Sequence, residues 1–600
     1  MNNKYLCNYM ICRFCILVGV VAFNLQPSYS QESANNEGVN IRLNQLGFYP
    51  GAPKTGIVLN SKSNEFYIQT IGKKNVFTGG LKKSTKPGLN GNFTGVANFT
   101  AYNTPGKYRL YVPGSGYSYP FEIKRSAHHD VANAAIKAYY FMRASIPLKE
   151  KYAGKWSRAE GHPDTNVLIH PSAADDKRPA GTSISSPRGW YDAGDYNKYI
   201  VNSGISTSTL LSLYEDFPAY MKTVKLNIPE SGNKIPDILN EVLWNLRWML
   251  TMQDPNDGGV YHKLTNTEFD KMEMPDKGTE PRYVVEKGTA ATLDFAAVMA
   301  QASRIFNKFP KLLPGLADSC LTQANKAWAW ANKNPAIVYN QDAMNQKFSP
   351  KVVTGAYGDR NFSDEFTWAA SEQFVTTKNP EFLKSITLLP DTNMPLPTWS
   401  QVRLLGYYTL IKNKNSLGAD SPKELPETKK RLLAFADKLV SGADETAYQT
   451  VMTKSTRNFG WGSNSVAANQ GVALIQAYKL SHNKKYLNYA LANLDYILGR
   501  NASGYSYITG YGSKTPMHPH HRPSVADGIV DPIPGLLVGG PNPGMQDKIR
   551  VPSTVPDEAY IDDDRAYAAN EIAINWNAPF AYLANAIEAL QNELNTSNKY

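Results

Sequence analysis

Two kinds of hydrophobic pattern divide the chain. Between about residues 40 and 124, apolar and polar residues alternate over short stretches, which are separated by turn residues such as Pro87-Gly88 and Pro105-Gly106. Short alternating segments at this spacing predict a small antiparallel β-sandwich. The predicted strands cover residues 41–43, 55–59, 66–69, 106–112 and 119–123.

From residue 126 onward, apolar residues recur at helical spacing. Long loops, notably residues 161–187 and 501–559, interrupt the helices, and loops of this length in a compact domain usually serve a functional site. We therefore predict a β-sandwich over residues 40–125 and an all-helical domain over residues 126–600 with its function in its loops. The predicted helices cover residues 128–142, 203–214, 235–252, 289–306, 314–332, 363–377, 398–410, 427–440, 465–480, 485–498 and 578–594.

The first 30 residues have the composition of a secretory signal. Lys4 and Arg13 precede an apolar stretch, residues 14–23, and small residues stand before a cut after Ser30. We expect cleavage there, export to the periplasm or the outside, and a short linker over residues 31–39. No stretch reaches the roughly 20 apolar residues that a membrane helix needs, so we predict no membrane partner.

Composition narrows the class of protein. The chain has 42% hydrophobic and 19% charged residues, which is a globular balance. Its net charge of +11 comes from dispersed lysines and arginines, without the basic run of a nucleic-acid-binding arm. The 36 Tyr, 10 Trp and 22 Phe suggest a surface that stacks against flat ligands. Outside the predicted signal one cysteine remains, Cys320, in an apolar pattern that predicts a buried, inert thiol.

Two carboxylates three residues apart follow the first long loop. Residues 189–196 read Gly-Trp-Tyr-Asp-Ala-Gly-Asp-Tyr, so that Asp192 and Asp195 flank an Ala-Gly turn. Such a turn can aim both carboxylates at one point, where one orients a water and the other takes its proton. The alternative is that Asp195 caps the helix that follows.

A glutamate, Glu571, lies among Ala, Ile and Trp residues near the C-terminus. Pro579 favours a helix that begins with Asn577 as its cap, which leaves Glu571 on the irregular segment before it. An apolar environment raises the pKa of a carboxyl and suits a general acid. A solvated surface glutamate is the alternative.

A histidine-rich loop lies between these two segments. Residues 516–523 read Pro-Met-His-Pro-His-His-Arg-Pro. Prolines stiffen this stretch, and no cysteine or partner helix supplies the usual metal-ligand spacing, so a substrate-contacting loop is favoured over a metal site. The chain has no Gly-x-Ser-x-Gly elbow, no Gly-Lys-Ser/Thr phosphate loop and no His-Glu-x-x-His helix. The absence of these motifs argues against a serine hydrolase, a nucleotide hydrolase or a zincin.

Together, these segments resemble glycoside hydrolase family 9, the inverting cellulases, in the subgroup with an N-terminal immunoglobulin-like module. Residues 41–48 are similar to the start of that module, residues 189–195 to the base-bearing loop, residues 506–522 to the histidine motif and residues 560–578 to the acid motif. The likeness covers nearly the whole chain after the predicted signal, in the family's order. It implies an (α/α)6 barrel with a cleft on one face, built from the long loops.

By that resemblance Asp195 is the general base, Asp192 helps to hold the attacking water, and Glu571 is the acid that protonates the leaving oxygen. His520 and Arg522 match sugar-contacting residues beside the cleaved bond. The other positions that the resemblance assigns to substrate binding are Trp461, Trp368, His262 and Trp576, of which Trp461 and Trp368 are also consistent with core positions.

Two features depart from the family pattern. Many members with this module hold zinc through cysteines and histidines before the base motif, but residues 152–187 contain His162 and His170 and no cysteine, so we do not expect that zinc. The resemblance allows structural calcium without indicating its ligands, because the three aspartates at 562–564 are equally consistent with capping and hydrogen bonding. Trp576 stands where relatives often have tyrosine.

The leading hypothesis is an exported, monomeric endo-β-1,4-glucanase that inverts the anomeric centre of cellulose or a related β-glucan and needs no cofactor for its chemistry. Alternatives on the same machinery are xyloglucan or mixed-linkage glucan as substrate, or an exo-acting β-glucosaminidase. A non-catalytic glycan-binding protein would not need an acid and a base. The sandwich either braces the barrel or binds sugar, and its alternating core pattern favours bracing.

Overall fold

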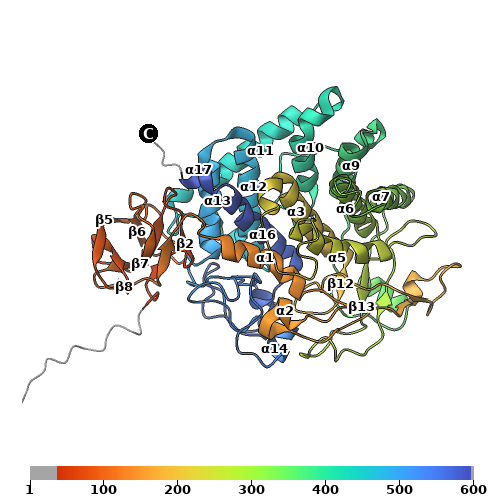
Figure 1. Cartoon of the computed structure of the whole chain (residues 1–600), viewed down its shortest axis with the longest axis horizontal. Helices are drawn as coiled ribbons and strands as arrows, with labels where there is room; N and C mark the ends of the chain where they lie inside the picture. The colour runs from red at the N-terminus through yellow and green to blue at the C-terminus, as the bar shows by residue number, and fades with distance from the viewer. Residues whose placement is uncertain (1–36, 596–600) are drawn as a thin grey trace, which may run out of the picture.

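The computed structural model describes residues 37–595, and a β-sandwich lies at one side of a larger helical body (Figure 1). This is the fold class that the two patterns predicted. The predicted signal lies outside the described residues. Among the described helices, none combines the length and the apolar character of a membrane span.

The sandwich is one continuous sheet that folds over its own core. The first half of strand β5 pairs with β4 and its second half with β6, which gives the order β1-β3-β6-β5-β4-β7-β9-β2, with β8 beside β7. Inward-facing Phe66, Ile68, Leu110 and Val112 are fully buried and alternate with outward-facing residues. The strands are β1 (Ile41–Arg42), β2 (Gly47–Phe48), β3 (Thr55–Leu59), β4 (Glu65–Thr70), β5 (Asn75–Lys83), β6 (Thr94–Asn98), β7 (Gly106–Val112), β8 (Gly116–Tyr117) and β9 (Phe121–Ile123).

The sequence pattern missed four of these strands, β2, β5, β6 and β8, and one pairing direction. Gly79 and Gly80 interrupt the alternation in β5, as Gly95 does in β6. Strands β2 and β9 pair in parallel, although an antiparallel sandwich was predicted. The parallel pair arises because β2 belongs to the segment that enters the sandwich and β9 to the segment that leaves it.

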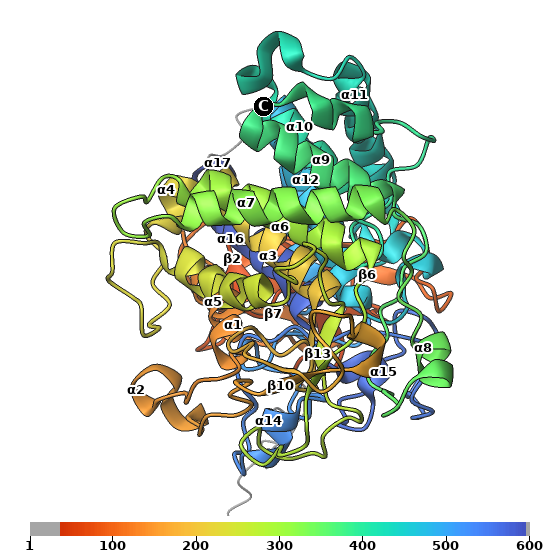
Figure 2. The ribbon, with the colours of Figure 1, turned by 90° about the vertical axis from the view of Figure 1, so that its right-hand side faces the viewer.

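The helical body has an inner ring and an outer layer. The inner helix α6 is buried around nearly its whole circumference, whereas the outer helix α7 packs across the outside of α6 and buries one face (Figure 2). The inner helices are α3 (Ile200–Asp216), α6 (Thr289–Phe306), α9 (Ser363–Thr377), α10 (Arg403–Leu417), α12 (Ser463–Ser481) and α16 (Ile574–Ala589). The outer helices are α1 (His129–Phe141), α5 (Asp237–Thr251), α7 (Leu316–Lys333), α11 (Leu425–Val440) and α13 (Lys484–Ile497). Short helices are α2 (Glu150–Ala153), α4 (Pro218–Met221), α8 (Gln341–Lys347), α14 (Arg522–Ala526), α15 (Tyr567–Asn570) and α17 (Gln591–Asn595).

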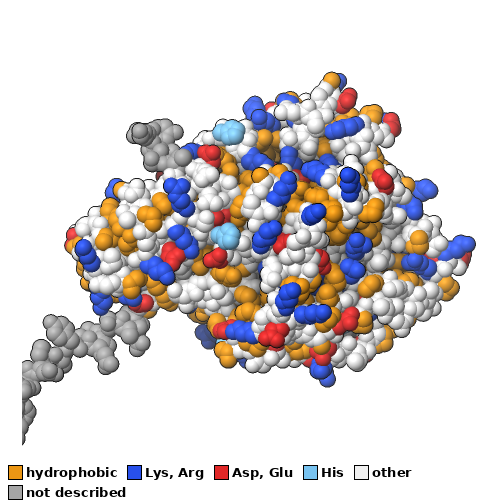
Figure 3. Space-filling view, viewed as in Figure 1, with side chains coloured by type: hydrophobic (Ala, Val, Ile, Leu, Met, Phe, Trp, Pro, Cys, Tyr) orange, Lys and Arg blue, Asp and Glu red, His pale blue; other side chains and the backbone are white. Residues whose placement is uncertain are grey.

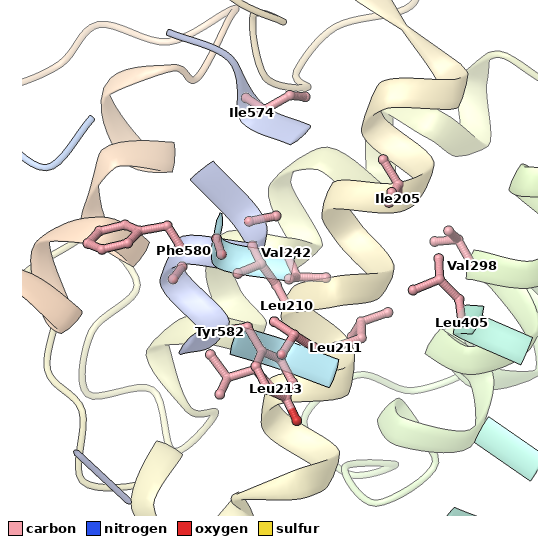
Figure 4. Close-up of a cluster of buried hydrophobic side chains, with 14 of the residues drawn as sticks. Ile205, Leu210, Leu211, Leu213, Val242, Val298, Leu405, Ile574, Phe580 and Tyr582 are labelled. Carbon is pink, nitrogen blue, oxygen red and sulfur yellow. The ribbon is translucent and has the colours of Figure 1, made fainter. Parts of the chain in front are cut away.

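Helix α3 is an inner helix that packs against α5, α6 and α16. Its residues Leu210, Leu211 and Leu213 are fully buried in a cluster that includes Val242 of α5 and Phe580 of α16 (Figure 4). Burying one such side chain contributes about 1.5–3 kcal/mol. Because α3 begins directly after the segment with Asp192 and Asp195, this packing anchors that segment.

A small second sheet supports the same segment from the other side. Its five strands lie in the order β11-β10-β14-β13-β12, and β12 connects the carboxylate turn to α3. The pattern analysis missed this sheet because each strand has two or three residues. Its strands are β10 (Val167–Ile169), β11 (Ser183–Ile184), β12 (Lys198–Tyr199), β13 (Lys263–Thr265) and β14 (Tyr283–Val284).

Cys320 lies on α7 and is buried, as predicted. Burial raises the pKa of its thiol to about 12, which keeps the reactive thiolate scarce at neutral pH. Charged side chains are scattered over the face drawn in Figure 3, where lysines and arginines alternate with acidic and polar groups.

The sandwich holds the loop that leads to the histidine motif. Gln45 accepts hydrogen bonds from the backbone N–H groups of Ser513 and Lys514, at 2.8 and 2.9 Å, and donates to the carbonyl of Gly504 at 2.9 Å. Beside it, Asn44 donates to the carboxylate of buried Asp495 at 2.8 Å. These contacts support a bracing role for the sandwich.

Candidate active site

The carboxylate turn before α3 presents Asp195 without using it as a helix cap. Its Oδ2 accepts hydrogen bonds from Asn197 Nδ2 at 2.6 Å and from the Tyr199 hydroxyl at 3.2 Å. Helix α3 begins after Tyr199 and has no side-chain cap, so the capping alternative for Asp195 is wrong. Asp195 is 5% exposed and lies in the wall of a cleft.

Asp192 is the more enclosed of the two aspartates. Asn202 Nδ2 donates to its oxygens at 2.9 and 3.0 Å, and the Tyr357 hydroxyl donates to Oδ2 at 3.0 Å. Burial and the neighbouring charge of Asp195 raise the pKa of Asp192 well above its usual range. These donors fix its orientation beside Asp195.

Glu571 lies on irregular chain just before α16, as predicted, but the helix starts earlier than expected. It begins at Ile574 after Ala573, so the predicted cap, Asn577, is wrong and Pro579 lies inside the helix. The Asn577 side chain instead accepts from the backbone of Leu537 and donates to that of Ala135, two contacts that are remote in sequence.

Glu571 lies against the carboxylate turn. Its Oε1 accepts from the backbone N–H of Gly194 at 3.3 Å. Burial, followed by the charges of Asp195 and Asp192, raises the pKa of Glu571 well above its usual range. The alternative of a solvated surface glutamate is therefore wrong, and the carboxyl is suited to hold a proton at neutral pH.

His520 is held beside Glu571 with one ring nitrogen left available. Its Nδ1 lies 2.6 Å from the carbonyl oxygen of Asp564, which can only accept, so Nδ1 carries the hydrogen and Nε2 is an acceptor. Burial lowers the pKa of His520, which favours this neutral form.

The aspartate run at residues 562–564 takes part in hydrogen bonding. Asp562 accepts hydrogen bonds from the backbone N–H groups of Met517 and His518.

Arg522 connects three segments of the site. Its Nη1 donates to the carbonyl of Gly194 at 2.7 Å, and its Nε donates to the carbonyl of Asp270 at 2.9 Å. The guanidinium lies 5.7 Å from the ring centre of Phe269. Arg522 therefore clamps the carboxylate turn to the loop between β13 and β14.

These groups line one cavity of about 690 Å³. Among the predicted site residues, the cavity brings together Asp192, Asp195, Glu571, His520, Arg522, Trp461 and Trp576. It is also lined by residues that were not predicted individually, namely Tyr199, Phe269, Tyr357, Trp399, Tyr567 and Asn575. Of these, Tyr199, Tyr567 and Asn575 lie within or beside the motif segments. Tyr357 lies between two nearby glycines, Gly355 and Gly358, and has a left-handed φ of 51°, whereas Phe269 and Trp399 have no signal in the sequence.

Two predicted substrate-binding residues do not line this cavity. Trp368 is fully buried within α9, so the core interpretation of its helical pattern is the correct one. His262 is 1% exposed and stacks on Tyr339 with ring centres 3.9 Å apart. Its Nε2 contacts the carbonyl of Ala356 at 2.8 Å, so it supports the cleft wall from behind.

The two histidines that were examined as zinc ligands have other partners. His162 Nδ1 contacts the Tyr191 hydroxyl at 2.9 Å, and both ring nitrogens of His170 contact oxygens, of Ser172 and Pro350. Within residues 37–595, no group of three or more His, Cys, Asp or Glu side chains is arranged to hold a metal ion.

Comparison with known proteins assigns this chain to a family. The model of glycosyl hydrolase family 9 matches residues 128–584, and that of the cellulase N-terminal ig-like domain matches residues 36–117. A xyloglucan-specific endo-beta-1,4-glucanase of Bacteroides ovatus is 45% identical over 582 residues, which are 97% of this chain and 99% of that protein. Endoglucanase D of Acetivibrio thermocellus is 33% identical over 552 residues, which are 90% of this chain and 82% of that protein.

The fold agrees with these sequence matches. A solved structure of a family 9 protein of Bacteroides ovatus superposes with a TM-score of 0.88 at 45% identity, and the match covers 92% of this chain and 100% of that chain. The chain therefore belongs to glycosyl hydrolase family 9, and its (α/α)6 barrel follows an immunoglobulin-like sandwich.

Proposed function

We propose that this protein is an endo-acting β-1,4-glucanase that inverts the anomeric carbon. The observation that carries the proposal is the meeting of two carboxylate segments in one cleft, where Gly194 of the first donates to Glu571 of the second. An inverting hydrolysis needs a base and an acid on opposite sides of the scissile bond. Asp195 and Glu571 are available for these two roles.

In the proposed reaction, Asp195 takes a proton from a water as the water attacks the anomeric carbon. Glu571 donates its proton to the glycosidic oxygen as the bond to that oxygen breaks. Asp192, oriented by Asn202 and Tyr357, helps to hold the water. The raised pKa of Glu571 supports the acid role, because the group must enter the reaction protonated.

The remaining cleft residues suit a neutral sugar chain. The Nε2 of His520 can accept a hydrogen bond from a sugar hydroxyl, because its Nδ1 hydrogen is engaged by Asp564. Trp461, Trp399 and Trp576 offer ring faces for stacking against pyranose rings. Family 9 enzymes need no cofactor for this chemistry.

We also propose that the protein is exported and monomeric and that it can bind structural calcium. The sandwich would span residues 40–125 and the barrel residues 126–600.

Xyloglucan is a second candidate substrate on the same machinery. The observation that favours it is the 45% identity to a protein whose name specifies xyloglucan. The product profile on xyloglucan, cellulose derivatives, mixed-linkage glucan and chitosan oligosaccharides separates these substrates. Internal cleavage products would support endo action, and monosaccharide release from one chain end would contradict it.

The roles of the two carboxylates can be tested separately. In Asp195→Ala, we expect the hydrolysis rate to fall by about 100- to 10,000-fold, the usual contribution of a general base, and azide to restore cleavage with an α-glycosyl azide as product. In Glu571→Gln, we expect a similar loss on polysaccharide but near-normal cleavage of an aryl β-cellobioside whose leaving group needs no proton.

Glu381→Gln, which alters an exposed carboxylate, is the matched control and should keep full activity. Proton NMR of the first product should show the α anomer. Near-normal hydrolysis of polysaccharide by either site variant, or a β product, would contradict the proposal.

A further inference from the structure

An exposed apolar surface lies at the edge of the cleft. The side chains of Phe269, Met272 and Val353 are 46%, 40% and 56% exposed, and Phe269 also lines the cavity that contains Asp195 and Glu571. We call these three residues the apolar lip. Large apolar groups that a soluble protein keeps exposed next to its active site commonly mark a binding surface.

The lip is built on chain that is firmly held in place. The backbone N–H of Val353 donates to the carbonyl of Thr267 at 2.8 Å, which ties the loop between β13 and β14 to the loop before α9. The Tyr196 hydroxyl and Arg522 Nε donate to the carbonyls of Glu273 and Asp270. The exposure of the three apolar side chains is therefore a feature of an anchored surface, which a ligand can use without an ordering cost.

The lip is close to the reacting groups. The Phe269 ring centre lies 5.7 Å from the Arg522 guanidinium, Arg522 donates to Gly194, and Gly194 donates to Glu571. A group resting on Phe269 would thus lie beside a sugar bound at the scissile bond. Phe269 lines the cavity, whereas Met272 and Val353 do not, so the lip extends outward from the cavity lining.

We propose that the apolar lip binds branch sugars carried by a β-1,4-glucan backbone, and so makes this enzyme prefer a decorated glucan. The inference rests on the proposed function. A branch on the primary hydroxyl of a glucose unit projects sideways from the backbone, so it meets the rim of a cleft rather than its floor. A pentose such as xylose has an apolar C–H face and no charge, which suits stacking against the exposed ring of Phe269, with the apolar Met272 and Val353 exposed on the two loops that carry the lip.

The test compares decorated and undecorated substrates of the same backbone length. We measure kcat/KM of the full-length protein on a xyloglucan oligosaccharide and on a cello-oligosaccharide. In Phe269→Ala we expect the ratio of kcat/KM on the xyloglucan oligosaccharide to kcat/KM on the cello-oligosaccharide to fall about tenfold, the size expected for one lost aromatic contact. Phe269→Tyr should restore the preference.

Two further variants separate binding from structural support. The double variant Met272→Ser/Val353→Ser changes exposed side chains and should reduce activity on the decorated substrate alone. Val530→Ala changes a side chain that is 84% exposed and lies outside the cleft lining, and it should alter neither activity.

Each contrary result has a distinct meaning. Equal losses on both substrates in Phe269→Ala would overturn the proposal, because Phe269 would then act through Arg522. A parent enzyme that cleaves the cello-oligosaccharide but not the xyloglucan oligosaccharide would overturn it while leaving the proposed glucanase function intact. Cleavage of neither substrate would contradict the proposed function itself. A dimer that dissociates in Phe269→Ala would instead identify the lip as a contact between copies and overturn the proposal.

Discussion

The backbone N–H of Gly194 donates a hydrogen bond to the carboxylate of Glu571, with 3.3 Å between the two atoms. This contact joins two segments that are 377 residues apart in sequence. The carbonyl of Gly194 also accepts a hydrogen bond from Arg522 at 2.7 Å. Gly194 thus sets the position of the proposed acid relative to the proposed base one residue away.

A side chain at position 194 should disrupt this arrangement. A methyl group there would lie 2.4 Å from the carbonyl oxygen of His520 and 3.2 Å from Glu571 Oε1. We expect Gly194→Ala to reduce kcat on a glucan by about 100-fold, because small displacements of catalytic groups have effects of that size. The control is Gly460→Ala, where no atom lies within 4 Å of the added methyl group. Similar kcat values for the two variants would contradict the role assigned to Gly194.

The hydroxyl of Tyr357 should matter through Asp192. In Tyr357→Phe, Asp192 loses the donor at 3.0 Å and keeps Asn202. A typical hydrogen bond contributes about 0.5–1.5 kcal/mol, so we expect kcat to fall about two- to tenfold, with KM little changed. The control is Tyr408→Phe, since that buried hydroxyl has no hydrogen-bond partner in the described chain. An unchanged kcat in Tyr357→Phe would show that Asn202 alone orients Asp192.

Activity should persist to a pH well above the ordinary range of a glutamate. The proposed acid works only while it is protonated, and burial with two nearby aspartates raises the pKa of Glu571. As the pH rises through that pKa, the proton is lost and kcat/KM falls. We expect the midpoint of this alkaline limb, measured as kcat/KM against pH, to lie above the usual range of a glutamate, and a midpoint within that range would contradict the acid role.

The pH profile also distinguishes Glu571 from His520. Burial lowers the pKa of His520, so the imidazole is already neutral across the alkaline limb and should not produce it. His520→Gln should lower kcat/KM at every pH and leave the midpoint in place. A shifted midpoint in His520→Gln would assign the limb to the histidine instead.

The contact between the sandwich and the barrel should be measurable as stability. Gln45→Ala removes the acceptor for the N–H groups of Ser513 and Lys514 and the donor to Gly504. We expect a loss of about 1–3 kcal/mol in the free energy of unfolding, because these groups lose their partners. Gln45→Glu keeps the acceptor oxygen and should lose less. Thermal unfolding of both variants gives the order, and a melting temperature for Gln45→Ala equal to that of the parent would contradict the bracing role.

Much of the fold could be predicted from local patterns. Apolar residues at helical spacing placed α6 and α9 with their observed bounds, because a buried helix face imposes that period on the sequence directly. The same logic failed for β5, where Gly79 and Gly80 break the alternation, although hydrogen bonds to β4 and β6 form the strand nevertheless. It also misplaced the start of α16, because Asn577 bonds to Leu537 and Ala135 rather than to its own helix.

Some residues of the candidate site could be predicted from short motifs, and others could not. Motif segments indicated Asp192, Asp195 and Glu571, because residues adjacent in a short turn are recognisable together. The resemblance assigned Trp368 and His262 to substrate binding, with a core position as the alternative for Trp368, and side-chain direction in the packed structure places both residues outside the cavity lining. Phe269 and Trp399 belong to loops whose course follows from contacts with distant segments, so no local pattern marks them.

The sequence by itself determined a helical domain behind a β-sandwich and the carboxylates that resemble an inverting pair, since periodicity and short motifs are written in neighbouring residues. The tertiary structure alone decided that Gly194 meets Glu571, that Gln45 of the sandwich holds the loop toward His520, and that an apolar lip borders the cleft. Each of these relationships joins segments that are far apart along the chain. Their geometry depends on the packing of the barrel and its loops, which no single stretch of sequence specifies.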